Sequence, residues 1–267
     1  MKNFKNSLCV LAVSLAVTMV GRAQSPACDE SGLWQLWVTC SNSAYEHTSV
    51  VAACRDFRVK APREPLGIVV AGWEAWHLLK LGDTNAAIAL FEPMMAVTEK
   101  SSCLQAAGIE MARNWLTRLD REKVRGALKK IYLRDIAFPA SLESLKSLKN
   151  FPIPPLTDRW GKPWEYRLEC SLKGMNNQQY VLESTRLGSR SDLASMLALP
   201  YANDITLDPI RLSSANADTV EFSNGTGKSA FLQAGSTFNG NTVAYLGEKI
   251  IVLADENHWR VVLMPRQ

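Results

Sequence analysis

The sequence predicts an α+β protein of several domains: antiparallel helical hairpins first, then a small helix-plus-antiparallel-sheet domain, then a small all-β domain. Three observations predict this order. Up to about residue 136, proline is sparse and apolar residues recur three and four positions apart, as in helices. Residues 137–206 mix a short helix, prolines and two strand-like runs. Residues 218–264 contain short runs rich in Val, Ile and aromatics, separated by turn residues.

Residues 1–23 are expected to be a signal peptide that is removed on export. Lys2 and Lys5 precede an uncharged apolar run at 8–20, and small residues flank Arg22, where a signal peptidase would cleave after Ala23. The run is shorter than the roughly 20 residues that cross a bilayer, so no membrane span is expected after cleavage. This segment carries +3 of the formal net charge of +4, which leaves +1. We therefore expect no nucleic-acid partner.

Five cysteines follow the expected cleavage point. An exported protein enters an oxidising compartment, so one or two disulfides are plausible. An odd number leaves at least one thiol free or paired between chains. The pairing stays open among Cys28, Cys40, Cys54, Cys103 and Cys170.

The helical region is expected over residues 26–119. Apolar residues in 65–81 share one stripe, Gly82 can end that helix, and Asp83 can cap the next one. This two-helix texture resembles a tetratricopeptide-type hairpin, over roughly one repeat. Ser102 and Gln105 form a capping box for a further helix, and another helix is expected to follow from Asp120.

The stretch DRWGKPWEY, residues 158–166, is interpreted as a turn that leads into a strand. Asp158 can accept hydrogen bonds from turn amides, Gly161 permits a left-handed conformation, and Pro163 can begin the strand. Three aromatic residues alternate at period two, so they are expected to share one face and cover the preceding helix: Trp160, Trp164 and Tyr166.

Residues 128–205 carry a more specific pattern of helix, turn, strand, second strand and loop. The positions that define it are Pro139, Leu142, Leu145, Asp158, Trp160, Gly161, Pro163, Tyr166, Tyr180, Ser184, Gly188, Asp192, Asp204 and Ile205. In order and spacing they resemble the globular part of the major pseudopilin of type II secretion systems. The resemblance covers about 80 residues and implies a pseudopilin-like α+β domain, here at 120–206.

The departures from that family also matter. The chain lacks the family's prepilin cleavage motif and the long apolar helix that follows it, and Arg159 stands where the family has proline. The family binds calcium in the loop after the second strand, which implies a possible calcium site at Asp192, Asp204 and the carbonyl of Ser184. The other reading is a loop held by ordinary hydrogen bonds. No other cofactor is expected.

The C-terminus resembles the small periplasmic β-domain of inner-membrane secretion and pilus-assembly proteins that touch the outer-membrane secretin. The residues in register are Ala230, Gly235, Val243, Leu246, Ile251, Leu253 and Val262. We expect a linker at 207–217 and this β-domain at 218–267. Both resemblances imply the periplasm, or the outer face, of a Gram-negative-type cell envelope, and protein partners that include a secretin.

The sequence offers no recognisable catalytic frame. It has no nucleophile elbow and no pair of its three histidines at a metal-ligand spacing. The expected function is therefore a non-enzymatic envelope scaffold or assembly component. Two alternatives stay open. One is an exported hydrolase with acids around Asp158 and Glu165, and the other is a carbohydrate- or peptide-binding module that uses Trp160 and Trp164.

Overall fold

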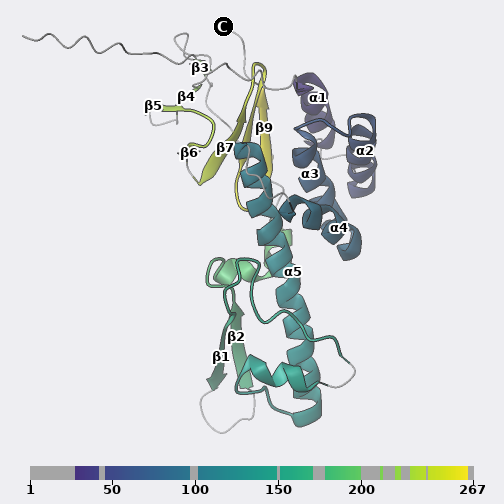
Figure 1. Cartoon of the computed structure of the whole chain (residues 1–267), viewed down its shortest axis with the longest axis vertical. Helices are drawn as coiled ribbons and strands as arrows, with labels where there is room; N and C mark the ends of the chain where they lie inside the picture. The colour runs from purple at the N-terminus through teal and green to yellow at the C-terminus, as the bar shows by residue number, and fades with distance from the viewer. Residues whose placement is uncertain are drawn as a thin grey trace, which may run out of the picture.

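The computed structural model describes residues 28–41, 46–96, 102–148, 151–170, 178–199, 211–212, 220–223, 229–238 and 240–263. It shows a mixed helix-and-sheet protein, which confirms the predicted α+β class. Figure 1 shows a long helix, α5, that links an upper part, which contains α1–α4 and the C-terminal strands, to a lower part that contains β1 and β2. The expected signal peptide and Asp204 lie outside the described residues, and none of the described helices has the length and apolar character of a membrane span.

The N-terminal region is helical, as predicted. It contains α1 (Glu30–Ser41), α2 (His47–Lys60), α3 (Gly67–Lys80) and α4 (Thr84–Met95). Between α3 and α4, Gly82 adopts a positive φ of 80°, and the carboxylate of Asp83 accepts a hydrogen bond from the amide of Ala86. Glycine is tolerated there because it has no side chain to clash, and the aspartate satisfies an unpaired amide of the next helix. The predicted turn chemistry at residues 82–83 is confirmed.

Helix α5 runs without a break from Cys103 to Asp135. The hydroxyl of Ser102 accepts a hydrogen bond from the amide of Gln105, which confirms the predicted start. The prediction that another helix begins at Asp120 is wrong, because Asp120 lies in the interior of α5 and is buried. The expected domain boundary between residues 119 and 120 thus falls inside one rigid element.

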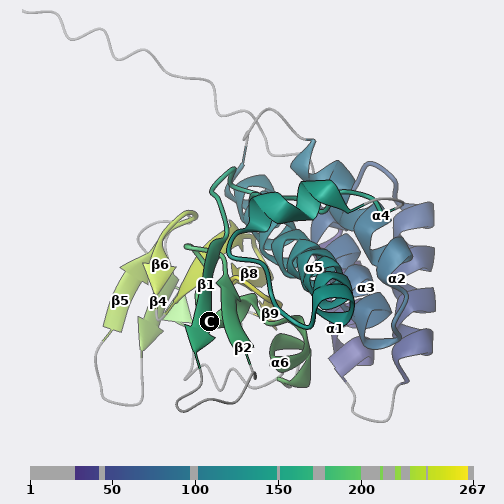
Figure 2. The ribbon, with the colours of Figure 1, turned by 90° about the horizontal axis from the view of Figure 1, so that it is seen from below.

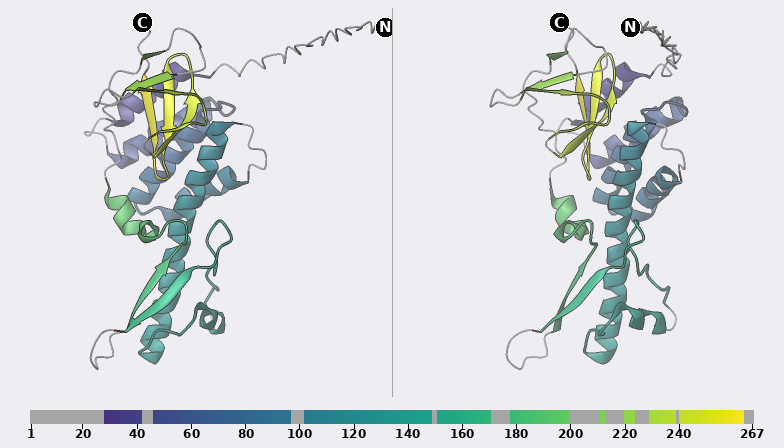
Figure 3. Two further views of the ribbon diagram at one scale, coloured as in Figure 1. Left: turned by 90° about the vertical axis from the view of Figure 1, so that its left-hand side faces the viewer. Right: turned by 60° about the vertical axis from the view of Figure 1, so that its left-hand side comes forward.

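The lower part is a small helix-and-hairpin unit. Strands β1 (Glu165–Cys170) and β2 (Gln178–Glu183) form an antiparallel pair beside the C-terminal half of α5, with the short helix η1 (Leu142–Ser147) near its end (Figure 3). Its core joins α5 to η1, to the start of β1 and to β2 through Val124, Ala127, Leu128, Ile131, Leu145, Trp164 and Leu182. Two short helices follow β2: η2 (Ser189–Ser191) and α6 (Leu193–Ala198).

The C-terminal strands form two sheets. Strands β3 (Arg211–Leu212), β4 (Val220–Ser223) and β5 (Ser229–Leu232) make one sheet. Strands β6 (Thr237–Phe238), β7 (Asn241–Leu246), β8 (Ile250–Ala254) and β9 (Trp259–Leu263) make an antiparallel sheet in sequence order. The runs predicted to be strands within residues 218–264 are strands, but they are divided between two sheets. The expected linker at 207–217 contains β3, and the rest of it is outside the described residues.

The β6–β9 sheet and the N-terminal helices share one hydrophobic core. In Figure 2 the helices α1–α4 lie on one side of α5 and the strands on the other. The core cluster combines residues of α1–α5 with six from the sheet: Ala244, Ile250, Val252, Ala254, Trp259 and Val261. The sequence predicts a separate C-terminal β-domain, but in the structure its β6–β9 sheet packs against the N-terminal helices in one core.

Trp259 is the residue that joins the two regions most closely. Its indole is fully buried, and it lies against the backbone of α3 at Gly72 and close to α5 at Gly108. A Cβ atom added at Gly72 would lie 2.3 Å from Nε1 of Trp259. The ring can lie this close to α3 because Gly72 has no side chain, whereas a Cβ atom at Gly108 would lie at an ordinary contact distance of 3.8 Å from the ring.

Glu30 fixes the first turn of α1 to the turn between β7 and β8. Its carboxylate accepts hydrogen bonds from the Tyr245 hydroxyl at 2.8 Å, the Lys249 amide at 2.6 Å and the Glu248 amide at 3.1 Å. A carboxylate that binds several amides is a strong, directional contact. It ties together segments that are more than 200 residues apart in sequence.

Candidate functional site

The turn at residues 158–162 is built around the side chain of Asp158. Its Oδ1 atom accepts hydrogen bonds from the amides of Trp160 at 3.0 Å and Lys162 at 2.9 Å. Gly161 has a φ of 77°. These contacts confirm the roles predicted for Asp158 and Gly161. Pro163 forms a bridge with Thr157, and β1 begins two residues later, at Glu165.

The same aspartate ties the turn to the end of β2. Its Oδ2 atom accepts a hydrogen bond from the Ser184 hydroxyl at 2.7 Å, and the Ser184 amide donates to the Ser191 hydroxyl at 3.0 Å. Asp158, Ser184 and Ser191 are all buried. Buried polar groups with complete hydrogen bonding hold one arrangement firmly, so this network fixes the turn and the loop after β2 relative to each other.

Arg159 fastens the turn to the helical region. Its amide donates to Oγ1 of Thr117 at 3.2 Å, and its guanidinium pairs with Asp120 on α5 and, at 3.0 Å, with Glu92 on α4. A proline at this position has neither the amide hydrogen nor the charge. The departure from the pseudopilin pattern therefore corresponds to contacts that only a residue such as arginine makes.

The three aromatics of the stretch do not share one face. Trp164 is buried in the lower core and Tyr166 packs against it, with its hydroxyl donating to the carbonyl of Pro139 at 2.7 Å. The prediction is wrong for Trp160, whose indole donates to Glu110 of α5 at 3.1 Å and lies under the guanidinium of Arg186. The positive φ at Gly161 breaks the strand alternation before β1 begins.

Of the residues implied for calcium, the described ones have protein partners. The Ser184 carbonyl accepts hydrogen bonds from the amides of Leu187 and Gly188. The Asp192 carboxylate caps α6 by accepting from the Ser195 amide at 2.7 Å and pairs with Arg121 at 3.0 Å. Asp204 is outside the described residues, within which no cluster of three or more His, Cys, Asp and Glu is placed to bind a metal. Calcium binding stays a prediction.

Asp192 should contribute stability that depends on pH. The hydrogen bonds from Ser195, and then the contact with Arg121, lower the pKa of Asp192 to about 2. A carboxyl whose pKa is lower in the folded state stabilises the fold above its unfolded pKa of roughly 3.9 and loses this effect as the pH falls through the folded pKa. We expect Asp192→Asn to cost about 0.5–1 kcal/mol of unfolding free energy at pH 7, less than the pKa shift alone implies because solvent screens this partly exposed carboxylate, and the difference should shrink as the pH falls toward 2. Urea titrations of both proteins between pH 7 and pH 2 measure it, and a difference that does not change with pH would contradict the assignment.

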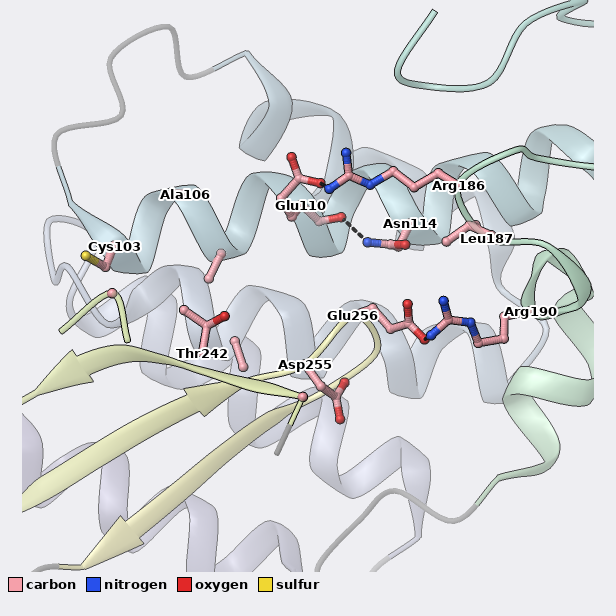
Figure 4. A pocket seen from close by; sticks show the side chains of 14 residues that line it. Cys103, Ala106, Glu110, Asn114, Arg186, Leu187, Arg190, Thr242, Asp255 and Glu256 are labelled. Atoms are coloured by element: carbon pink, nitrogen blue, oxygen red, sulfur yellow. Dashed lines mark hydrogen bonds and ion pairs between the residues drawn. The ribbon is translucent and has the colours of Figure 1, made fainter. Parts of the chain in front are cut away.

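A cleft of about 470 Å³ lies where α5, the loop after β2 and the β6–β9 sheet meet (Figure 4). Its polar side chains come from these three segments, which are distant in sequence. This cleft could not be predicted from the sequence, because nothing in any one of these segments identifies the other two. Its charged and amide-bearing lining residues are Glu110, Asn114, Arg186, Arg190, Asp255 and Glu256.

Ion pairs cross this cleft from the loop after β2 to both walls. Arg186 lies 3.4 Å from Glu110 of α5, and Arg190 pairs with Glu256 in the turn between β8 and β9. Burial alone would raise the pKa of Asp255, but hydrogen bonds from His258 and from the Asn257 amide outweigh it and lower the pKa below its usual value. The cleft therefore presents charges of both signs to a ligand.

Arg118 lies fully buried near this cleft. Its Nε donates to the carbonyl of Arg190 at 2.9 Å, and its guanidinium stacks on Trp115. Burial lowers its pKa to about 10. The Trp115 indole in turn donates to the Asn257 carbonyl at 3.2 Å. These contacts hold the loop after β2 and the β8–β9 turn onto the same stretch of α5.

A second hollow, which we call the α5 groove, runs along the lower half of α5 beside β2. It measures about 380 Å³ and is lined by Glu122, Arg125, Gly126, Lys129, Tyr132, Phe138 and Tyr180. Phe138 stacks on Tyr132 and meets Tyr180 edge to face. Leu133, in the last turn of α5, and Ile136, the residue that follows the helix, are 70% and 71% exposed. The groove is thus an aromatic wall beside a basic and apolar helix face.

Gly126 has no packing role within the described chain, because a Cβ added there would meet no atom within 4 Å. Glycine inside a helix is less favourable than alanine by about 1 kcal/mol. We expect Gly126→Ala to raise the unfolding free energy by about 0.5–1 kcal/mol, as measured by urea titration. A loss of stability would show that the glycine is needed by the fold itself. Gly108→Ala is the matched control and should destabilise, because its Cβ would lie 2.3 Å from Ile68 Cδ1.

Comparison with protein-family models, with curated proteins and with solved structures finds no match to this chain. Its function must therefore be inferred from its own residues and geometry.

Proposed function

We propose that the chain is an exported, non-enzymatic scaffold or assembly component of the cell envelope that serves a type II secretion or type IV pilus-like system. The main support for the proposal is the structural role of the DRWGKPWEY stretch. Its acid and two of its aromatics hold a strand pair on a long helix, as expected of a pseudopilin-like structural marker. Arg159, from the same stretch, binds α5 and α4.

The surfaces of the chain support protein binding. The α5 groove combines aromatic side chains with Lys129 and Arg125. The large apolar side chains of Leu133 and Ile136, at the end of the same helix, are exposed. Exposed large apolar residues beside aromatic and basic ones are typical of sites that bind another protein. Partners expected on this proposal are proteins of the secretion or pilus machinery, among them a secretin, in the periplasm or at the outer face of the envelope.

The proposal can be tested by gene deletion in a bacterium that encodes this chain. Deleting its gene should lower the amount of secreted proteins in the medium or of pili on the surface, and re-expression should restore them. We expect a Leu133→Asp variant to restore less than the wild type, because a charge would replace a large exposed apolar side chain one turn beyond Lys129, which lines the groove. Val59→Asp, at a similarly exposed position on α2, is the matched control. Normal secretion and piliation in the deletion strain would contradict the proposal.

The alternative is an exported hydrolase or a carbohydrate- or peptide-binding module. For the hydrolase, Glu165 is exposed whereas Asp158 is buried, so the two acids do not face one site. For the binding module, Trp164 is buried and cannot contact a ligand together with Trp160. What favours a binding module is Trp160, which contacts Glu110 and Arg186, two residues that line the cleft in Figure 4. Titration with short peptides and oligosaccharides while following tryptophan fluorescence tests it, with Trp160→Phe as the comparison.

A further inference from the structure

Two cysteines meet where the first two helices pack. Cys40 lies in the last turn of α1, and Cys54 lies in the middle of α2. Their side chains are hydrogen-bonded to each other. Cys54 belongs to the main hydrophobic core, and Cys40 packs against it while remaining half-buried. The structure therefore brings together two thiols that the sequence left among five unassigned ones.

The other described thiols lie elsewhere. Cys28 precedes α1 and interacts with Tyr245 and Glu64. Cys103 begins α5 and lines the cleft beside Gly235. Cys170 ends β1, in the lower part of the molecule. Among the cysteines whose side chains the structure describes, Cys40 and Cys54 are shown in contact with each other.

The two thiols differ in a way that suits a defined order of reaction. The hydrogen bond from Cys54 lowers the pKa of Cys40, which favours the thiolate at the half-exposed position. The hydrogen bond with Cys40, together with burial, raises the pKa of Cys54. The thiolate is the form that attacks a disulfide, and a more exposed thiol reaches an external disulfide more easily. Cys40 is therefore the thiol expected to react first.

We propose that Cys40 and Cys54 form a disulfide that clamps α1 to α2. The oxidant is an external disulfide, carried by a thiol oxidoreductase or an oxidised small thiol. The Cys40 thiolate attacks it, which forms a mixed disulfide and releases one thiol. The Cys54 thiolate then attacks the sulfur of Cys40, which forms the internal bond and releases the second thiol. Two protons and two electrons pass from the cysteine pair to the external disulfide.

The clamp closes a loop of roughly 15 residues, a length at which a disulfide restricts the unfolded chain substantially. It fixes the helix that carries Glu30, and thus the contact between the chain's N-terminal helix and the β7–β8 turn. The need for an oxidising compartment depends on the proposed export, whereas the pairing depends only on the geometry of the hairpin.

The test uses the chain from residue 24 onward, purified reduced and then equilibrated in glutathione buffers of increasing oxidised fraction. Alkylation followed by peptide mass spectrometry should identify one cross-link, between the peptides of Cys40 and Cys54. The oxidised chain should unfold at a temperature about 6–12 °C higher than the reduced chain. A cross-link between any other pair, or alkylation of both thiols in the most oxidising buffer, would overturn the inference.

Matched variants separate the pairing from general stability. Cys40→Ser should abolish the cross-link and the shift on oxidation, while Cys103→Ser should keep both. A shift that survives in Cys40→Ser would also overturn the pairing. Because this titration is done in vitro, failure there refutes the disulfide without bearing on export. If the pair forms in vitro but is fully reduced in native cells, the proposed export fails instead.

Discussion

Replacing Trp259 with alanine is expected to destabilise the helical region and the C-terminal sheet together, by about 3–5 kcal/mol. The indole is fully buried between α3, α5 and the sheet, at a contact where Gly72 leaves room for it. Removing it leaves a cavity that rigid helices cannot close. Because one core contains both regions, both should lose protection from hydrogen exchange at the same denaturant concentration.

Urea titration with hydrogen exchange checks this prediction. Phe231→Ala is the control, because this aromatic on β5 is 62% exposed and its loss should change stability by less than about 0.5 kcal/mol. If the sheet loses protection in Trp259→Ala while α1–α4 keep theirs, the two regions are separate folding units and the shared core is not the basis of stability.

Replacing Arg159 with proline, the residue found in the pseudopilin pattern, is expected to cost about 2–4 kcal/mol. The change removes the amide that donates to Thr117 and the guanidinium that pairs with Asp120. Asp120 is 1% exposed and would keep only Lys123 as a cation. A buried carboxylate that loses a partner is costly because it cannot regain its hydration.

Arg159→Lys separates the two contributions, because it keeps a charge and the amide but not the forked geometry; we expect a smaller loss. Arg167→Ala serves as the control, since that arginine on β1 is 71% exposed and its pairing with Glu169 is at the surface. Denaturant titration of all three variants gives the comparison. If Arg159→Pro is as stable as the wild type, the turn does not need its contacts with α5 and α4.

Much of the local structure could be predicted from the sequence, because local patterns carry it. Gly82 ends α3, Asp83 caps α4 and Ser102 caps α5, each through contacts with residues only a few positions away. Asp158 accepts the amides of its own turn, which the residue types alone predict.

The rest depends on contacts between distant residues. Asp120 looks like a helix cap in sequence, yet it is a buried partner of Arg159, which is 39 residues away. Trp160 follows the strand alternation in sequence, but the turn at Gly161 directs it to Glu110. The cleft and the shared core depend on the β6–β9 sheet packing against helices that precede it by more than 100 residues, which no local pattern reveals.

The most direct test of the proposed function measures binding between the full exported chain and the purified periplasmic domain of a secretin from the same bacterium. The full chain is needed because its C-terminal sheet shares a core with the helices. The account predicts saturable binding with a dissociation constant at or below tens of micromolar, weakened by Leu133→Asp and retained by Val59→Asp. Absence of binding at that concentration, with a wild-type chain shown to be folded, would contradict it.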